Sequence, residues 1–123
     1  RLQKIGRIPS DPEILLRDLS ALSRYTVGKR KKDFRKRFKK FKGRKHRGLR
    51  TLGEAWLTMH IRKERSAAPD LMKKALKEVG ENPTLKPWTR LGEAMALRKV
   101  DRDLEAAEVY LQLIEEFPDH YLV

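Results

Sequence analysis

The stretch TLGEAWLTMH at residues 51–60 returns as RLGEAMALRK at residues 90–99, and this internal repeat decides the fold. Leu52-Gly53-Glu54-Ala55 matches Leu91-Gly92-Glu93-Ala94 at an offset of 39 residues. A second set matches at an offset of 35 residues: Leu71, Met72, Ala75, Leu76, Val79 and Pro83 correspond to Ala106, Ala107, Tyr110, Leu111, Ile114 and Pro118. The two offsets differ by four residues, and the loop between the helices, around residues 66–70, absorbs this difference. This pattern predicts a helix–turn–helix unit present twice, with helices over residues 49–65, 69–79, 87–99 and 102–116.

Proline and glycine mark the ends of these predicted helices. Pro69 and Pro87 stand where a first helical turn tolerates a missing N–H group. Gly80 suits a C-terminal stop, and Pro83 and Pro118 follow predicted helix ends. The fold class is therefore predicted to be all-α.

N-terminal to the repeats, a separate amphipathic helix is expected over residues 11–25. Ser10 and Glu13 form a capping-box pattern around Pro12. An apolar stripe follows at i, i+4 and i+7, formed by Leu15, Leu19 and Leu22. Residues 1–9 show no clear period and are expected to form an extended arm, and Gly28 is a plausible helix stop. Residues 1–28 are thus expected to be one part of the chain.

The net charge of +13 is concentrated in one segment. Residues 29–50 contain fourteen Lys or Arg and one acid, Asp33, whereas the rest of the chain contains sixteen bases and sixteen acids. A dense block of like charge repels itself and favours a polyanionic partner. Residues 29–48 are therefore expected to be a basic, RNA-binding segment that precedes the repeat pair at residues 49–123.

An aromatic stripe runs through the basic segment. Phe34, Phe38 and Phe41 recur at i, i+4 and i+7, which places them on one face of a helix. The sequence predicts a helix that ends near Gly43, followed by a tail over residues 44–48. A helical aromatic stripe most often belongs to a core, so packing on the N-terminal helix or the first repeat is favoured over stacking on bases.

The repeat unit resembles the tetratricopeptide repeat. In the second unit, the W-x2-L-G spacing and the later Ala, aromatic and Pro positions are matched by Trp88, Leu91, Gly92, Ala106, Tyr110 and Pro118. The first unit matches at Leu52, Gly53, Trp56 and Pro83, and departs from the pattern at Leu71 and Ala75. The resemblance covers about residues 49–120 and implies a short solenoid of stacked helix pairs. Two units are fewer than the roughly three that a free solenoid needs, so another element or a partner is expected to cover the open ends.

The basic segment is expected to bind RNA phosphate through charge alone, with counterion release driving affinity. No zinc finger or other duplex-reading module is present, which favours RNA over DNA. The predicted RNA-binding residues are Lys29, Arg30, Lys31, Lys32, Arg35, Lys36, Arg37, Lys39, Lys40, Lys42, Arg44, Lys45, His46, Arg47 and Arg50.

A basic extension joined to helical repeats resembles organellar ribosomal proteins. This resemblance implies a structural component of a mitochondrial ribosome, located in the matrix, with ribosomal RNA and neighbouring ribosomal proteins as partners. The first residue is Arg1 rather than Met, which suits removal of a presequence. The alternatives are a protein–protein adaptor or assembly factor whose basic block is a localisation or acidic-partner element, a different ribonucleoprotein particle in the cytoplasm or nucleus, and attachment to anionic lipid.

Other function classes are not expected from this sequence. There is no cysteine, no phosphate-binding glycine motif and no nucleophile elbow, so neither an enzyme nor a cofactor is predicted. His46, His60 and His120 lack the spacing of metal ligands. No apolar run approaches the roughly 18 residues of a membrane span. Residues 103–119 carry six acids and no base, and are expected to be a solvated face or a surface for a basic protein neighbour.

Overall fold

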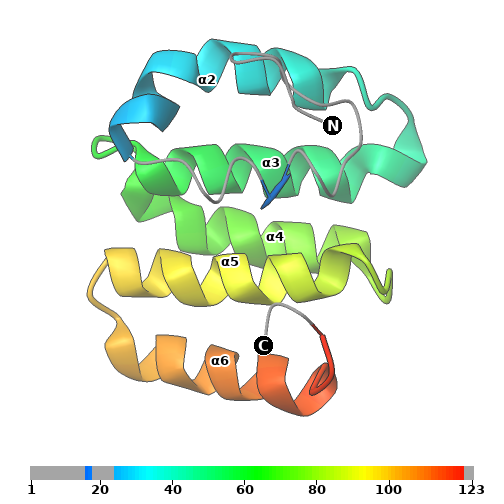
Figure 1. The fold of residues 1–123 in the computed structure, drawn as a ribbon, viewed down its shortest axis with the longest axis vertical. Helices are drawn as coiled ribbons and strands as arrows, with labels where there is room; N and C mark the ends of the chain where they lie inside the picture. The colour runs from blue at the N-terminus through cyan, green and yellow to red at the C-terminus, as the bar shows by residue number, and fades with distance from the viewer. Residues whose placement is uncertain (1–15, 18–23, 121–123) are drawn as a thin grey trace, which may run out of the picture.

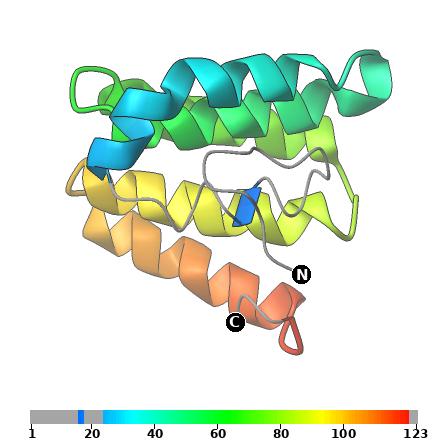
Figure 2. The ribbon, with the colours of Figure 1, turned by 45° about the horizontal axis from the view of Figure 1, so that its top comes forward.

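A computed structural model describes residues 16–17 and 24–120 and shows an all-α fold, as predicted. The helices are α2 (Arg24–Lys39), α3 (Arg47–His60), α4 (Ala68–Val79), α5 (Leu85–Lys99) and α6 (Asp103–Glu116), with 3₁₀ turns η1 (Arg44–His46) and η2 (Arg65–Ala67). Each helix packs on the next one along the chain, and α3 also contacts α5. The helices therefore form one stack with α2 at one end and α6 at the other (Figures 1 and 2).

The predicted helix over residues 11–25 and the arm over residues 1–9 lie almost entirely outside the described residues. Residues 16–17 are helical, and Leu16 is completely buried within the main core. Residues 121–123 also lie outside the described part.

The predicted stop at Gly28 is wrong, because α2 begins at Arg24 and runs through Gly28. A glycine inside a helix costs only about 1 kcal/mol relative to alanine. Burying the phenylalanines further along α2 outweighs that cost, since a fully buried phenylalanine contributes roughly 1.5–3 kcal/mol. The helix is therefore held by its packing and is not ended by its weakest residue.

The predicted tail over residues 44–48 is also wrong. Gly43 adopts φ +92°, which turns the chain, and residues 44–46 form η1. Helix α3 then starts at Arg47, with Gly48 buried against Val79 of α4. The missed signal is tertiary: the local sequence is polar, but the neighbouring α4 holds Gly48 in place.

The predicted helix over residues 49–65 ends earlier, at His60, where Ile61 takes an extended conformation. The next residues, Arg62 and Lys63, are exposed and offer no apolar face to bury. The basic helix also ends earlier than predicted, at Lys39 rather than near Gly43. The remaining boundaries of the four repeat helices agree with the structure to within two residues. Pro69 lies in the first turn of α4, and Gly80 ends that helix with φ +57°.

The core is continuous from the basic helix to the second repeat. Phe34 and Phe38 of α2 are only 2% and 3% exposed and belong to the same cluster as Trp56 and Trp88. The two tryptophan rings meet edge to face, with centroids 5.7 Å apart and planes at 67°. Phe41 is half-buried against this cluster. The prediction that the phenylalanine stripe packs on the first repeat is therefore confirmed.

The two repeated glycines mark close approaches between helices. A Cβ atom at Gly53 would lie 2.5 Å from the ring of Phe38, and one at Gly92 would lie 2.6 Å from both Met72 and Trp56. Gly53 therefore admits α2 against α3, whereas Gly92 admits the side chains of α3 and α4 against α5. The recurrence of Leu-Gly in the sequence reflects the same spatial demand at two levels of the stack.

Replacing Gly53 by alanine is expected to destabilise the chain, because the new methyl group overlaps the base of a buried, rigid ring. Overpacking costs typically 1–3 kcal/mol, and the better helix propensity of alanine returns about 1 kcal/mol. We expect a net loss of up to about 2 kcal/mol in the free energy of unfolding, measured by urea denaturation. The double variant Gly53→Ala/Phe38→Leu should lose less than the sum of its single variants; strict additivity would contradict this contact.

Candidate nucleic-acid interface

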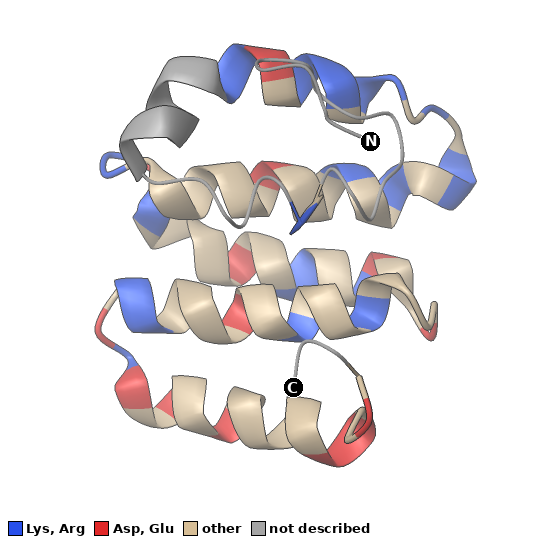
Figure 3. Cartoon of the chain, in the orientation of Figure 1, with Lys and Arg blue, Asp and Glu red and all other residues tan. Residues whose placement is uncertain are grey.

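Most of the predicted RNA-binding residues project from α2, η1 and the start of α3. Lys29 and Arg30 lie in α2, but their side chains fall outside the described part. Lys31, Arg35, Arg37, His46 and Arg50 are partly exposed. Eight more are exposed: Lys32, Lys36, Lys39, Lys40, Lys42, Arg44, Lys45 and Arg47. We call these eight residues the cationic surface. Figure 3 shows how densely Lys and Arg follow one another along α2 and the turn after it.

No acid in the described part of the chain neutralises the cationic surface. Within residues 31–120, none of its eight members takes part in an ion pair. The one acid of the segment, Asp33, is exposed and is also without an ion-pair partner in that range. Because the buried phenylalanines fix α2 on α3, these charges stand on a folded element. They are free to meet an external polyanion.

Arg35 has a different role from its neighbours. Its Nε donates a hydrogen bond to Glu54 Oε1 at 2.9 Å, and its Nη2 donates to Glu54 Oε2 at 2.7 Å. The same Nη2 lies 3.2 Å from an oxygen of Glu64. The hydrogen bonds to Glu54 raise the pKa of Arg35 above its usual value. A bidentate pair of this kind fixes geometry as well as charge, so Arg35 ties α2 to α3 and to the loop after it.

Arg50 and His46 also serve the local structure. Arg50 donates from Nη1 to the carbonyl oxygens of Phe41 and Gly43, at 2.6 and 2.9 Å. These carbonyls follow the end of α2, and satisfying such groups stabilises the turn. His46 places its ring edge to face with Phe41, with centroids 5.6 Å apart. Two predicted phosphate ligands, Arg35 and Arg50, therefore already use their guanidinium groups inside the chain.

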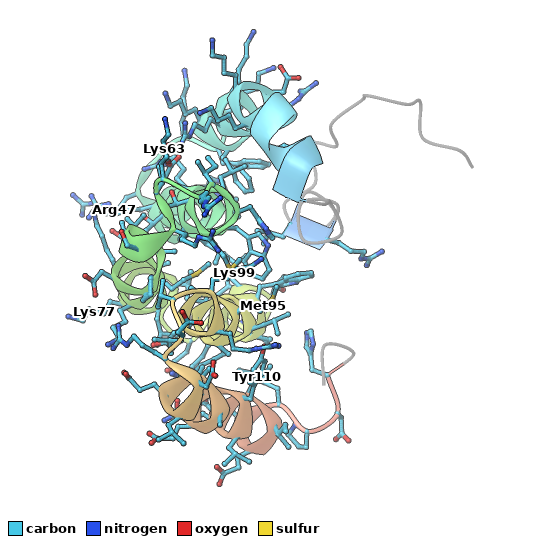
Figure 4. All side chains as sticks on the ribbon, turned by 90° about the vertical axis from the view of Figure 1, so that its left-hand side faces the viewer. Arg47, Lys63, Lys77, Met95, Lys99 and Tyr110 are labelled. Atoms are coloured by element: carbon cyan, nitrogen blue, oxygen red, sulfur yellow. The ribbon has the colours of Figure 1, made fainter. Side chains whose placement is uncertain are left out.

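The structure adds cations that the sequence did not single out. Lys63, in the loop after α3, and Lys77, on α4, are exposed and lie on the same side of the stack as Arg47 (Figure 4). They extend the positive side beyond the basic segment. The sequence did not single out these two lysines because the repeat region has no net excess of positive charge. Only the fold shows which of its lysines lie near the basic segment.

The phenylalanines of α2 are not available as base-stacking platforms. Phe34 and Phe38 are buried, which leaves half-buried Phe41 with limited contact to solvent. The groups that the cationic surface can use for binding are therefore positively charged side chains. Lys and Arg contacts to phosphate hold a nucleic acid in position without reading its sequence.

The opposite end of the stack has the opposite charge. In α6 the described residues include acids but neither Lys nor Arg, and Figure 3 shows this helix in red and tan. Phosphate would be repelled from this end. The charge distribution thus orients the chain, with α2 toward a polyanion and α6 away from it.

One carboxylate is buried, on α5. Glu93 lies 3.6 Å from the guanidinium of Arg90, a distance too long for a hydrogen bond. Burial raises the pKa of Glu93 above its usual range, and the positive charges of Arg90 and Lys73 offset this only in part. Among residues 16–17 and 24–120, no three His, Asp or Glu side chains gather as a metal site would require. No helix in that part of the chain is long and apolar enough to cross a bilayer.

The chain matches no protein-family model, and no curated protein or solved structure shows significant similarity to it.

The different roles of Arg35 and Lys36 can be separated by neutralising each in turn. Arg35→Gln removes a partly buried bidentate pair and should lower the free energy of unfolding by about 0.5–1.5 kcal/mol, allowing for solvent screening. Lys36→Gln, the matched control, removes an exposed charge from a self-repelling surface and should leave stability unchanged or slightly raised. Urea denaturation at moderate salt measures both. Equal effects of the two variants would argue against the structural role of Arg35.

The raised pKa of Glu93 predicts a pH-dependent cost to stability. The folded chain disfavours the charged carboxylate, so the cost is present above the folded pKa and disappears below the unfolded value, near pH 4. Glu93→Gln should therefore be more stable than the wild type at pH 7, with the difference shrinking as the pH falls. Urea denaturation of both proteins at pH 7 and near pH 4 tests this prediction. A variant that is less stable than the wild type at pH 7 would show that the ion pair with Arg90 outweighs desolvation.

Proposed function

We propose that this chain is a non-enzymatic structural component of a ribosome, the mitochondrial ribosome in particular. In this proposal the cationic surface binds ribosomal RNA phosphate, and the helical stack contacts neighbouring proteins. Placement in the mitochondrial matrix follows from the resemblance of the sequence to organellar ribosomal proteins. The RNA-binding part of the proposal is supported by the geometry of α2.

The observation that supports the proposal most strongly is that α2 has one buried apolar face and one exposed cationic face. One face of α2 buries Phe34 and Phe38 in the core, and the other presents lysines that have no ion pair within residues 31–120. Disordered basic tails are poor in aromatic residues and have no such anchor. A folded cationic surface is suited to sit against a folded polyanion, where the position of each phosphate is also fixed.

The expected binding mode is electrostatic and indifferent to base sequence. The available groups are ammonium and guanidinium ions, and the aromatic rings beneath them are mostly covered. If six or more cations contact phosphate, affinity should fall roughly a thousandfold or more between 50 and 200 mM salt. A ribosome supplies the dense phosphate that such a surface needs.

The second candidate function is a protein–protein adaptor or assembly factor. It is favoured by the apolar residues that α6 exposes at the far end of the stack. Under this alternative the basic segment is a localisation or acidic-partner element. Sedimentation of the tagged native protein with and without RNase separates the two functions, because only a component held by RNA should leave the heavy particle when the RNA is cut.

Neutralising two lysines of the cationic surface should weaken RNA binding, whereas neutralising two cations elsewhere should not. Lys32→Gln/Lys36→Gln removes neighbours on one exposed face of α2, and Arg98→Gln/Lys99→Gln makes the same charge change at the end of α5. We expect the first variant to reduce the slope of log affinity against log salt by about one per lysine removed. The second should keep the wild-type slope to within about one half.

The measurement is fluorescence anisotropy of a labelled RNA hairpin with the full chain, titrated over a range of salt concentrations. Equal loss of slope in both variants would mean that RNA responds to total charge alone, and the proposed surface would be wrong.

A further inference from the structure

At the far end of the stack, α6 presents apolar side chains to solvent. Leu104, Leu111 and Ile114 are 84%, 58% and 47% exposed, and they are the large apolar residues that stand out in this way among the described part of the chain. They follow one another at i, i+7 and i+10, with the exposed Ala107 between them, so they form one stripe along the helix. The inner side of α6 is already occupied, because Ala106, Val109 and Leu113 are buried against α5.

The apolar stripe has carboxylates along one edge and a shallow hollow along the other. On one edge, Glu108 and Glu115 are exposed at i and i+7 and have no ion-pair partner within residues 31–120. On the other edge, a shallow hollow of about 320 Å³ opens between α5 and α6, lined by Arg98, Asp103, Ala106, Ala107 and Tyr110. The stripe is thus a raised apolar strip bordered by unpaired carboxylates and by a recess that can receive a side chain.

Two other acids of α6, Glu105 and Glu116, are paired within the chain. Glu105 accepts two hydrogen bonds from Arg102, at 2.7 and 2.6 Å, and Glu116 pairs with Arg90 and Lys86 at 2.9 and 3.0 Å. These acids face toward the chain and are satisfied there. Glu108 and Glu115 lie beside the apolar stripe instead, and their charges remain available to a partner.

We propose that the outer face of α6 docks an amphipathic helix of another protein, one whose apolar stripe is flanked by Lys and Arg. This inference rests on the proposed function and names the chemistry of its protein neighbour. Apolar burial against Leu104 and Leu111 supplies most of the attraction, and the carboxylates of Glu108 and Glu115 select a basic partner.

Charge and apolar character together exclude the other occupants. Nucleic acid and anionic lipid carry the same sign as this face and are repelled. A second copy that docks through its own α6 would bring like charges together across a symmetric interface. A second copy that docks through α2 would offer lysines, but its described outer face has no large apolar residues with which to cover the stripe.

The test uses the full chain and a lactam-bridged helical peptide of the same length as α6, with leucines along one stripe and lysines on both flanks. The control peptide keeps the lysines and replaces the leucines by serine. Fluorescence anisotropy at moderate salt measures binding of each. We expect the leucine–lysine peptide to bind and the serine–lysine peptide to bind at least about tenfold more weakly, since burial of leucine supplies the attraction.

Two variants locate the binding on α6. Leu104→Ser/Leu111→Ser should weaken peptide binding by at least about tenfold, and these exposed positions leave the fold intact, as circular dichroism would verify. Glu108→Gln/Glu115→Gln should weaken it several-fold, whereas Asp33→Asn/Glu81→Gln, with the same change of net charge elsewhere, should not. Absence of binding to the wild type, or wild-type binding by Leu104→Ser/Leu111→Ser, would overturn the proposal.

Two further readouts complete the test. A dimer in analytical ultracentrifugation that Leu104→Ser/Leu111→Ser dissociates would assign the face to a second copy and overturn the proposal. RNA affinity, measured on Leu104→Ser/Leu111→Ser, should equal that of the wild type. Loss of peptide binding with normal RNA binding in the wild type refutes this inference alone, whereas peptide binding without RNA binding refutes the RNA role and leaves this inference standing.

Discussion

The contact between the phenylalanines of α2 and the surface of α3 is the one on which the rest of the structure depends. A helix dense in Lys and Arg is unfavourable by itself, because its neighbours at i+3 and i+4 repel each other. Burial of Phe34 and Phe38 opposes that repulsion, and Gly53 makes room for the second ring. The bidentate pair between Arg35 and Glu54 then fixes the same helix at its polar edge. Charge can be displayed on α2 only because apolar contacts hold the helix in place.

Two surfaces of different character lie at opposite ends of the helical stack. At the α2 end the surface is cationic, and at the α6 end it is acidic and partly apolar (Figure 3). The helices between them carry the tryptophan pair and the small residues that let neighbours approach. In the proposed role, this arrangement would keep phosphate binding and protein binding on separate ends of the chain. The opposite charges of the two ends would then orient the chain between an RNA and a protein neighbour.

Much of the fold could be predicted because its signals are local. The repeated Leu-Gly spacing and the prolines and glycine at the helix ends predicted the bounds of α4, α5 and α6 to within two residues, whereas α3 ends earlier than predicted. The period of the phenylalanines identified their buried face. The failures at the two glycines have tertiary causes. Gly28 continues a helix that is held by packing further along, and Gly48 lies in the first turn of α3 because Val79 packs against it. For the candidate site, counting charges located the segment but could not show that Arg35 and Arg50 are used internally, or that Lys63 and Lys77 lie on the same side of the stack as Arg47.

The self-repulsion of α2 has a consequence for the lifetime of the chain when it is alone. Any polyanion that binds the folded form and not the unfolded one raises stability by mass action, so the chain is at its least stable when it is unaccompanied. The helices α2 and α6 are the two ends of the described stack, and α2 is the one whose own charges repel each other, so local opening would begin most easily at α2. In the proposed role, copies made in excess of their binding sites would expose this end to proteases first, and the charge that favours RNA binding would also favour the degradation of surplus molecules.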